Sequence, residues 1–288
     1  MDQEKRAAGG YVRGRTEKMT EKQMANQFGK VSRFEVHAQK REGRTILSDV
    51  SFTAPYKLMA PFEKPDGGIQ IMPLCASAGI MRGDRQEFSY EAGEGADLEI
   101  LSQSFEKIHK MDGGAAYRHI RARVEKGASL YCCPQPVIPF AGSAYDSETE
   151  IYLADKSARL FWLEIICSGR VAHDEQFAFR RFSSLVRIYR EGKLIYRDNT
   201  CYEPDRMPMR GLGMFESCTH LANIFLSASF GDLREPIWDL LEKETECEGG
   251  VTLLPGEDLA VRIFGNRAQT LEKAAERIKG LARTCAAC

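Results

Sequence analysis

Short segments that alternate apolar and polar residues, each closed by turn residues, constrain this sequence more than any other feature. They cover residues 44–53, 68–74, 96–104, 117–124, 158–166, 184–190 and 193–199. Glycine-containing turn signals separate them at 41–44, 65–68, 91–97, 126–129 and 190–193. Links this short leave no room for the crossover helices of a parallel α/β fold, so the pattern predicts an all-β dominated architecture.

Helical periodicity enters late in the chain, first over residues 232–246. Asp232 and Glu235 stand at the spacing of a capping box, whereas Pro236 would suit the first helical position, so the start of this helix stays open. Ile237, Leu240 and Leu241, with Trp238 nearby, give the segment one apolar face.

A second helix is predicted over residues 266–283, where apolar residues recur on one stripe. Lys279 and Arg283 lie near its C-terminal end, where positive charge complements the helix dipole. Neither repeats nor low-complexity linkers interrupt the chain. We therefore predict a flexible N-terminal tail over 1–30 and a single β-rich domain over 31–288.

The charge balance and the apolar runs limit the classes of partner. Forty basic and 41 acidic side chains give a formal net charge of −1, whereas a dedicated nucleic-acid binder usually carries a basic excess. The sequence has neither an apolar run of the ~20 residues that span a bilayer nor the apolar segment of a secretory signal. We expect a cytoplasmic protein with reduced thiols that binds neither nucleic acid nor membrane.

The stretch SAGIMRGD, residues 77–84, could hold a phosphate, ligate a metal or turn the chain. A phosphate loop needs four residues between its glycines and then Lys with Ser or Thr. Here only three residues separate Gly79 from Gly83, and the acid Asp84 would repel a phosphate. The favoured interpretation is a turn with glycines at positive φ, and Asp84 remains a candidate hydrogen-bond acceptor or weak metal ligand.

One acid stands in a strongly apolar context. Glu164 lies within LFWLEII, so a strand buried on both faces would require its carboxylate to be paired, hydrogen-bonded or protonated. Arg170 and Glu175 flank the turn that follows. These residues could form a buried ion pair that fixes the turn, or line an internal polar passage.

The nine cysteines suggest free thiols rather than a disulfide framework, because the number is odd and two of them are adjacent. Cys285 and Cys288 have the spacing of half a thiolate metal site, which needs a partner group such as Cys218 and His220. We predict no permanent metal site, and the role of the Cys285/Cys288 pair stays open. A cysteine enzyme would need Cys167 or Cys218 beside His173 or His220, and scattered histidines give little support for one.

The order of segments resembles one family, the UreD (or UreH) urease accessory proteins. The resemblance runs from about residue 34 to 283 and rests on five segments in the family's order. These are GRTILSDVSFTAPYKLMAPF (43–62), SAGIMRGD (77–84), LYCCPQPVIPFAGSAY (130–145), CSGRVAHDEQF (167–177) and LAVRIFGNRAQTLEKAAERIKGLAR (259–283).

This resemblance implies an assembly protein rather than an enzyme. Family members bind the urease apoenzyme and the accessory protein UreF, which recruits the GTPase UreG, and the complex delivers nickel to urease. The implied partners are therefore UreF-like and UreG-like proteins and the urease structural subunits. GTP would be bound by a partner, and nickel would be in transit with no cofactor permanently held. The implied fold consists of stacked, helically wound β-sheets.

The resemblance also implies an internal polar passage as the nickel route. Carboxylates suit a divalent ion in transit, because they bind it more weakly than a closed Cys/His cage. The candidate passage residues are Asp84, Glu164 and Glu175, and the candidate turn residues are Gly79, Gly83, Gly169 and Arg170.

Two alternatives belong to other functional classes. A β-sheet module that binds a protein without any nickel role would use an exposed edge or face. A cysteine-dependent enzyme would contain one thiol of depressed pKa.

Overall fold

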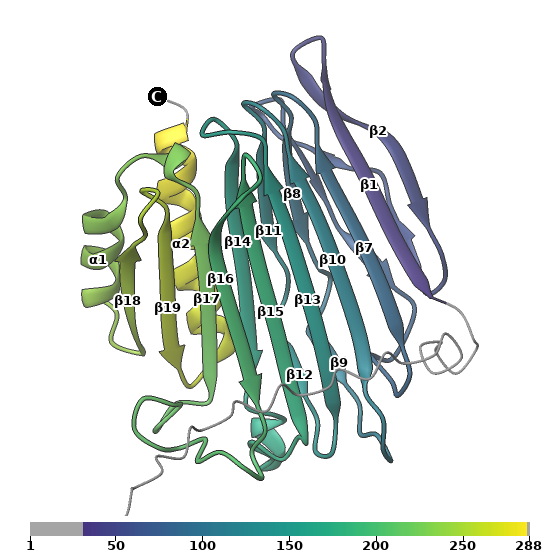
Figure 1. Cartoon of the computed structure of the whole chain (residues 1–288), viewed down its shortest axis with the longest axis vertical. Helices are drawn as coiled ribbons and strands as arrows, with labels where there is room; N and C mark the ends of the chain where they lie inside the picture. The colour runs from purple at the N-terminus through teal and green to yellow at the C-terminus, as the bar shows by residue number, and fades with distance from the viewer. Residues whose placement is uncertain (1–30, 287–288) are drawn as a thin grey trace, which may run out of the picture.

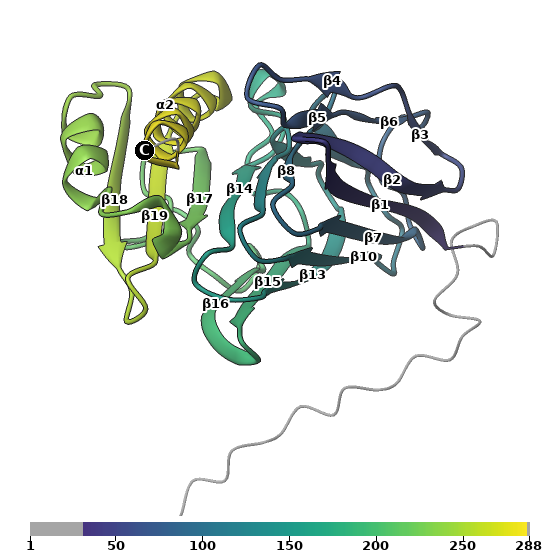
Figure 2. The same cartoon turned by 90° about the horizontal axis from the view of Figure 1, so that it is seen from above.

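Successive strands of the chain alternate between two facing sheets, with two helices packed against the outer side of one of them (Figures 1 and 2). This computed structural model describes residues 31–286. The predicted tail over 1–30 and Cys288 lie outside the described residues. The predicted dominance of β-structure is confirmed, with two α-helices among the described residues.

The first sheet has seven strands in the order β16-β15-β13-β10-β7-β1-β2. Their bounds are β1 (Ser32–Arg41), β2 (Arg44–Phe52), β7 (Arg85–Ala92), β10 (Ala116–Val124), β13 (Ala144–Leu153), β15 (Arg181–Arg190) and β16 (Lys193–Tyr202).

The second sheet has ten strands, eight of them in the order β18-β19-β17-β14-β11-β8-β5-β4, with β12 beside β14 and β9 beside β12. Their bounds are β4 (Phe62–Glu63), β5 (Ile69–Ile71), β8 (Asp97–Leu101), β9 (Glu106–Ile108), β11 (Ser129–Cys133), β12 (Val137–Pro139), β14 (Arg159–Cys167), β17 (His220–Leu226), β18 (Cys247–Leu253) and β19 (Leu259–Gly265). A further pair of short strands, β3 (Tyr56–Leu58) and β6 (Pro73–Cys75), forms a two-stranded sheet.

Most central neighbours in both sheets are parallel, although no helix connects them. In the seven-stranded sheet β1, β7, β10, β13 and β15 pair in parallel, and in the ten-stranded sheet β5, β8, β11 and β14 do so. Parallel strands need a long crossover, and here the crossover is a strand of the opposite sheet. The chain thus winds in coils through both sheets, which agrees with helically wound sheets.

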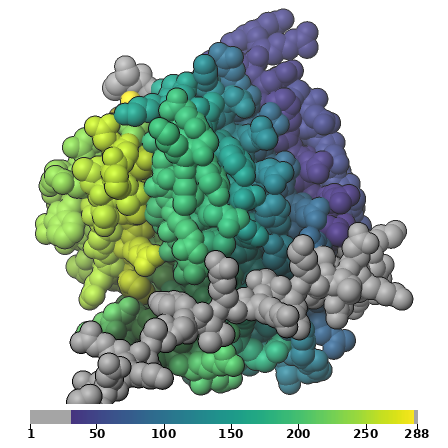
Figure 3. Space-filling model, in the orientation of Figure 1, coloured from purple at the N-terminus to yellow at the C-terminus, as the bar shows by residue number. Residues whose placement is uncertain are grey.

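Strict alternation along each strand produces an inner and an outer face. In β13, Asp146, Glu148 and Glu150 point outward, whereas Ser147 and Ile151 point between the sheets. The outer face of the seven-stranded sheet, seen in Figure 3, carries ion pairs between neighbouring strands, such as that of Arg187 on β15 with Glu148.

Three apolar clusters hold these layers together. The first fills one half of the space between the sheets and includes Phe34, Leu98 and Ile151. The second lies between the ten-stranded sheet and the helices α1 (Arg234–Glu242) and α2 (Ala268–Ala286). The third, around Phe182 and Phe215, closes one end of the sandwich.

Helix α1 is shorter than predicted and is capped differently. It begins at Arg234, so Pro236 is its third residue, and Asp232 accepts a hydrogen bond from the Arg234 amide at 3.1 Å. Placing Trp238 on its apolar face was wrong, because Trp238 is 44% exposed while Ile237 is buried. Neither helix within residues 31–286 combines the length and the apolar content that a bilayer-spanning helix needs.

Helix α2 is attached to the sheet by a buried ion cluster, formed by the lysine and arginine that the sequence analysis placed near its C-terminal end. Lys279 Nζ lies 2.6 Å and Arg283 Nη2 2.8 Å from the two carboxylate oxygens of Glu99 on β8. The Arg283 guanidinium also stacks over the ring of Tyr131, 3.8 Å from its centroid. Burial disfavours the Glu99 charge, but the hydrogen bond from Lys279 and the two cations outweigh it and lower the Glu99 pKa.

We expect Glu99→Gln to lower the free energy of unfolding by about 3 kcal/mol, because it leaves two cations without their buried partner. Glu276→Gln is the matched control, since Glu276 contacts the same Lys279 at 2.7 Å but its side chain is 58% exposed. The control should cost less than about 1 kcal/mol. Urea unfolding of both variants measures the difference, and equal losses would contradict the role given to the buried cluster.

Candidate functional site

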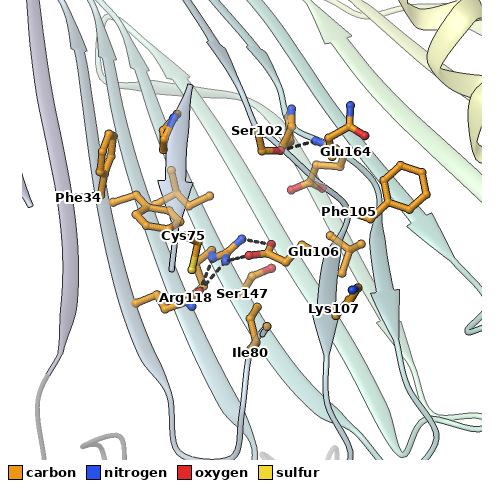
Figure 4. Close-up of a pocket in the computed structure, with 18 of the residues that line it drawn as sticks. Phe34, Cys75, Ile80, Ser102, Phe105, Glu106, Lys107, Arg118, Ser147 and Glu164 are labelled. Atoms are coloured by element: carbon orange, nitrogen blue, oxygen red, sulfur yellow. Dashed lines mark hydrogen bonds and ion pairs between the residues drawn. The ribbon is translucent and has the colours of Figure 1, made fainter. Parts of the chain in front are cut away.

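A cavity of about 560 Å³ with a mixed polar and apolar lining lies between the two sheets, beside the first apolar cluster, which supplies part of its wall (Figure 4). Its walls come from the inner faces of both sheets and from the segment 76–81. Asp84 and Glu164 both line it, so the structure brings together two of the three predicted passage acids. Glu175 is not part of the lining.

One wall is a continuous polar row that crosses the seven-stranded sheet. Its members occupy the same position in neighbouring strands, and each lines the cavity: Ser32, Gln86, Arg118, Ser147, Ser184 and Thr200. The corresponding row four residues further along the first five strands is apolar: Val36, Tyr90, Ala122, Ile151 and Ile188. The cavity therefore lies where neighbouring strands place polar side chains at the same height in the sheet.

Arg118 is the buried cation of this row. Its guanidinium donates to both carboxylate oxygens of Glu106 on β9, one of them at 2.5 Å, and to the side-chain oxygen of Gln86 at 2.6 and 2.8 Å. It also stacks 4.8 Å from the Phe88 ring centroid. Burial alone would lower the Arg118 pKa, but the Glu106 charge raises it well above its ordinary value. A charged side chain thus joins the two sheets across the cavity.

Glu164 projects from β14 into the same cavity. Its two carboxylate oxygens accept from the Ser184 hydroxyl at 3.3 and 3.4 Å. Burial, together with the nearby Asp198 charge, raises the Glu164 pKa to about 7. Asn223 stands opposite it on β17, and its buried side-chain oxygen accepts no hydrogen bond from the described residues. This end of the cavity therefore offers oxygen ligands and a carboxyl that titrates near neutral pH.

Asp84 belongs to the SAGIMRGD segment, which forms part of the cavity wall as well as a turn. Asp84 accepts a hydrogen bond from the Met81 amide at 2.8 Å, and burial raises its pKa. Gly79 and Gly83 have φ of +145° and +80°, as the predicted turn requires. A Cβ on Gly79 would meet the Lys107 carbonyl oxygen at 2.4 Å, so only glycine fits there.

Glu175 and Arg170 form an ion pair in the turn after β14. Glu175 accepts from the Arg170 guanidinium and from the Ala141 amide, at 2.6 Å. The hydrogen bond from Arg170 outweighs burial and lowers the Glu175 pKa. Gly169 has φ of +145°, and a Cβ there would meet the Glu175 carbonyl oxygen at 2.5 Å. This geometry matches the ion pair that fixes a turn, the first of the two interpretations of Glu175.

The cysteine–histidine arrangements are poorly suited to nucleophilic catalysis. Cys167 and His220 stand opposite each other on β14 and β17. Burial raises the Cys167 pKa to about 12 and lowers that of His220 to about 4, so both groups are neutral at pH 7. Cys285 is exposed. Within residues 31–286, no three His, Cys, Asp or Glu side chains gather closely enough to hold a metal ion.

The sequence analysis did not identify Arg118, Glu106 or the other residues of the polar row as site residues. A signal for the row exists in the sequence, because Gln86, Arg118, Ser147 and Ser184 are polar residues at inward positions of strands whose inner faces are largely apolar. Only the register between strands reveals that these positions are neighbours. Glu106 gives no such signal, because its three-residue strand is too short to show alternation.

The Glu164 pKa predicts an unusual dependence of stability on pH. Between about pH 4.5 and 7 the folded chain holds a proton that the unfolded chain has lost, so this group lowers the free energy of unfolding as pH rises. Relative to wild type, Glu164→Gln should gain up to about 3 kcal/mol across that window.

Glu175→Gln is the control of opposite sign. The folded-state pKa of Glu175 is lowered, so its contribution is present above the unfolded value and is lost as pH falls. Urea unfolding at a series of pH values measures both variants. A Glu164→Gln profile parallel to that of wild type would show that Glu164 is ionised in the folded chain.

Comparison with known proteins identifies the family. The model of the UreD urease accessory proteins matches residues 30–287. The chain is 35% identical over 261 residues to the urease accessory protein UreD of Acetivibrio thermocellus, covering 90% of this chain and 99% of the relative.

Two further relatives extend the match. The urease accessory protein UreH of Helicobacter pylori is 36% identical over 237 residues, covering 82% of this chain and 89% of the relative. The UreD of Haemophilus influenzae is 27% identical over 257 residues, covering 84% and 94%. These relatives are named as accessory proteins rather than enzymes, which confirms the prediction that the chain is not an enzyme. The chain belongs to the UreD urease accessory protein family.

Proposed function

We propose that this chain assists the maturation of urease by binding the urease apoenzyme together with UreF-like and UreG-like partners, and by providing a route for nickel through the cavity between its sheets. The observation that carries the proposal is the presence of two carboxyl groups, Asp84 and Glu164, in the lining of one cavity. Nickel is the cargo of this process and not a resident cofactor. GTP would be bound by the UreG-like partner.

The ligands in the cavity suit a divalent cation that must be released again. Carboxylate, hydroxyl and amide oxygens from Asp84, Glu164, Ser184 and Asn223 all face the cavity. Oxygen donors hold borderline divalent metals less firmly than a set of thiolates and imidazoles does. Conduction requires binding that is strong enough for entry and weak enough for exit, which such scattered oxygens provide.

Both cysteines that line the cavity favour the neutral thiol. Burial is the main cause that raises the pKa of Cys75, and the nearby Glu106 adds to it. Burial likewise raises the pKa of Cys132 well above its usual range. A metal binds the thiolate rather than the thiol, so these side chains would not trap a passing ion at neutral pH. This supports the preference for acids over cysteines.

Glu164 would couple cation binding to proton release. With a pKa of about 7 it is partly protonated at neutral pH, so an arriving cation must displace the remaining proton. The proton returns when the ion leaves. A carboxyl of this kind binds a divalent ion only transiently, in contrast to one that is always ionised.

The test is urease activation in cells that express the urease subunits and the other accessory proteins with this chain intact, absent or carrying Asp84→Asn with Glu164→Gln. We expect the double variant to be captured with its partners but to yield urease with at least about tenfold less nickel, since each lost carboxylate removes a charged ligand. Nickel content of purified urease and pull-down of the partners are measured together.

The matched control replaces two exposed carboxylates in turns, Glu94→Gln with Glu191→Gln, and should leave the nickel content unchanged. Full nickel loading with the cavity variant would contradict the route and leave the two acids a structural role. If removing the chain changes neither assembly nor nickel content, a binding module without a nickel role becomes the better interpretation.

A further inference from the structure

The Arg118–Glu106 ion pair spans the cavity between the two sheets. Arg118 comes from β10 of the seven-stranded sheet and Glu106 from β9 of the ten-stranded sheet, and Figure 4 shows their side chains meeting end to end. Both Glu106 oxygens accept from Arg118, while Gln86 holds the guanidinium from its own sheet. Arg118 is 9% exposed, so the charge has little access to bulk water.

This pair stands between the two acids of the proposed route. Asp84 lies two residues before Gln86 of β7, the strand beside Arg118, whereas Glu164 contacts Ser184 on β15, two strands beyond Arg118. Cys75 is exposed, whereas Cys132 is buried and pairs with Trp162 on β14, two residues from Glu164. Both cysteines line the cavity. The order along it is therefore an outer part with Asp84 and Cys75, then the ion pair, and then an inner part with Cys132 and Glu164.

In this order, a cation that moves from the outer to the inner part passes the Arg118 guanidinium, which Gln86 and Glu106 hold in place. Outside bulk water, like charges at a few ångströms repel each other strongly, and an arginine cannot relieve this by losing its proton. The obstacle is removed only if a carboxylate compensates for the cation as it passes. Glu106 is the carboxylate in place, and a divalent ion competes for it with arginine better than a monovalent ion does.

We propose that the Arg118–Glu106 ion pair is a charge-selective gate within the cavity. In the closed arrangement the guanidinium keeps cations from the inner part. The gate opens when Glu106 exchanges Arg118 for the arriving divalent cation, and Gln86 retains the released guanidinium. This inference rests on the proposed nickel route, because it names the residue pair that controls passage along it.

The two cavity cysteines allow the gate to be tested on the isolated full-length chain without urease. The chain is treated with a cationic reagent, 2-aminoethyl methanethiosulfonate, or an anionic one, 2-sulfonatoethyl methanethiosulfonate, and labelling of each cysteine is followed by peptide mass spectrometry. The ratio of the two rates at one thiol cancels the effect of its pKa. Cys133, which is buried under α2 rather than in the cavity, reports any general opening of the fold.

Two variants should change the ratio at Cys132 in opposite directions. Arg118→Met leaves Glu106 alone and should raise the cationic-to-anionic ratio by at least about tenfold, whereas Glu106→Gln leaves Arg118 alone and should lower it by a similar factor. The ratio at Cys75 should shift in the same direction but by a clearly smaller factor, because Cys75 senses the changed local field and is reached without passing the pair.

The comparison between the two thiols separates a gate from a local field. Since Cys75 lies beside the same charges, a purely local effect would alter both ratios equally, and that result would overturn the gate. Unchanged ratios at both thiols would also overturn it. If Arg118→Met unfolds the chain, as rapid labelling of Cys133 would reveal, the nearly isosteric Glu106→Gln variant decides the question.

Nickel content of co-expressed urease distinguishes failure of the gate from failure of the route. If Glu106→Gln lowers the nickel content while its partners are still captured, the gate is supported. If Asp84→Asn with Glu164→Gln lowers it but Glu106→Gln does not, the gate is wrong and the route remains. If the labelling ratio shifts but no cavity variant changes the nickel content, the route is wrong.

Discussion

The register between parallel strands is the constraint on which the rest of this structure depends. Because each coil hydrogen-bonds to the next without offset, residues at equivalent positions lie side by side across the sheet. A polar residue at the same position of each coil therefore forms a polar row across the sheet. An apolar residue at the same position of each coil forms a layer of the apolar core. The cavity and the core are two levels of a single repeating arrangement.

Buried charges complete this arrangement where side chains from the two sheets must meet. Arg118 meets Glu106 at the cavity, while Arg190 on β15 meets Asp258, at 2.5 Å, on the far side of the apolar core. Isolated charges in such places would be strongly unfavourable, so each of the two sites joins a cation to an acid from the opposite side of the sandwich. The difference lies in their surroundings, because only the Arg118 pair borders open space.

Local patterns in the sequence were sufficient for several of the strands and placed two acids that the structure brings to one cavity. The predicted segments 117–124, 158–166 and 184–190 all coincide with strands, because alternation depends on neighbours in sequence. The isolated acid in an apolar strand, Glu164, proved to face a cavity together with Asp84. The extent of a single domain over 31–288 stays a prediction.

What the sequence could not provide are contacts between distant segments. Lys279 was interpreted through its own helix, yet its partner Glu99 is 180 residues away. Arg118 was hidden within a basic, alternating strand whose other arginines, such as Arg121, point to solvent. Glu175 was grouped with the passage acids by sequence proximity, although the turn directs it to Arg170.

The polar row also determines where the chain can change in length. A single residue inserted into β10 before Arg118 would send that guanidinium to the outer face and place the residue that precedes it in the cavity. The same insertion in the turn at 125–128, which only connects β10 to β11, would leave both strands in phase with the adjacent coils. Family members should therefore vary in length at their turns while the strand segments that border the cavity keep a constant residue count, so that gaps in an alignment would outline the cavity without any coordinates.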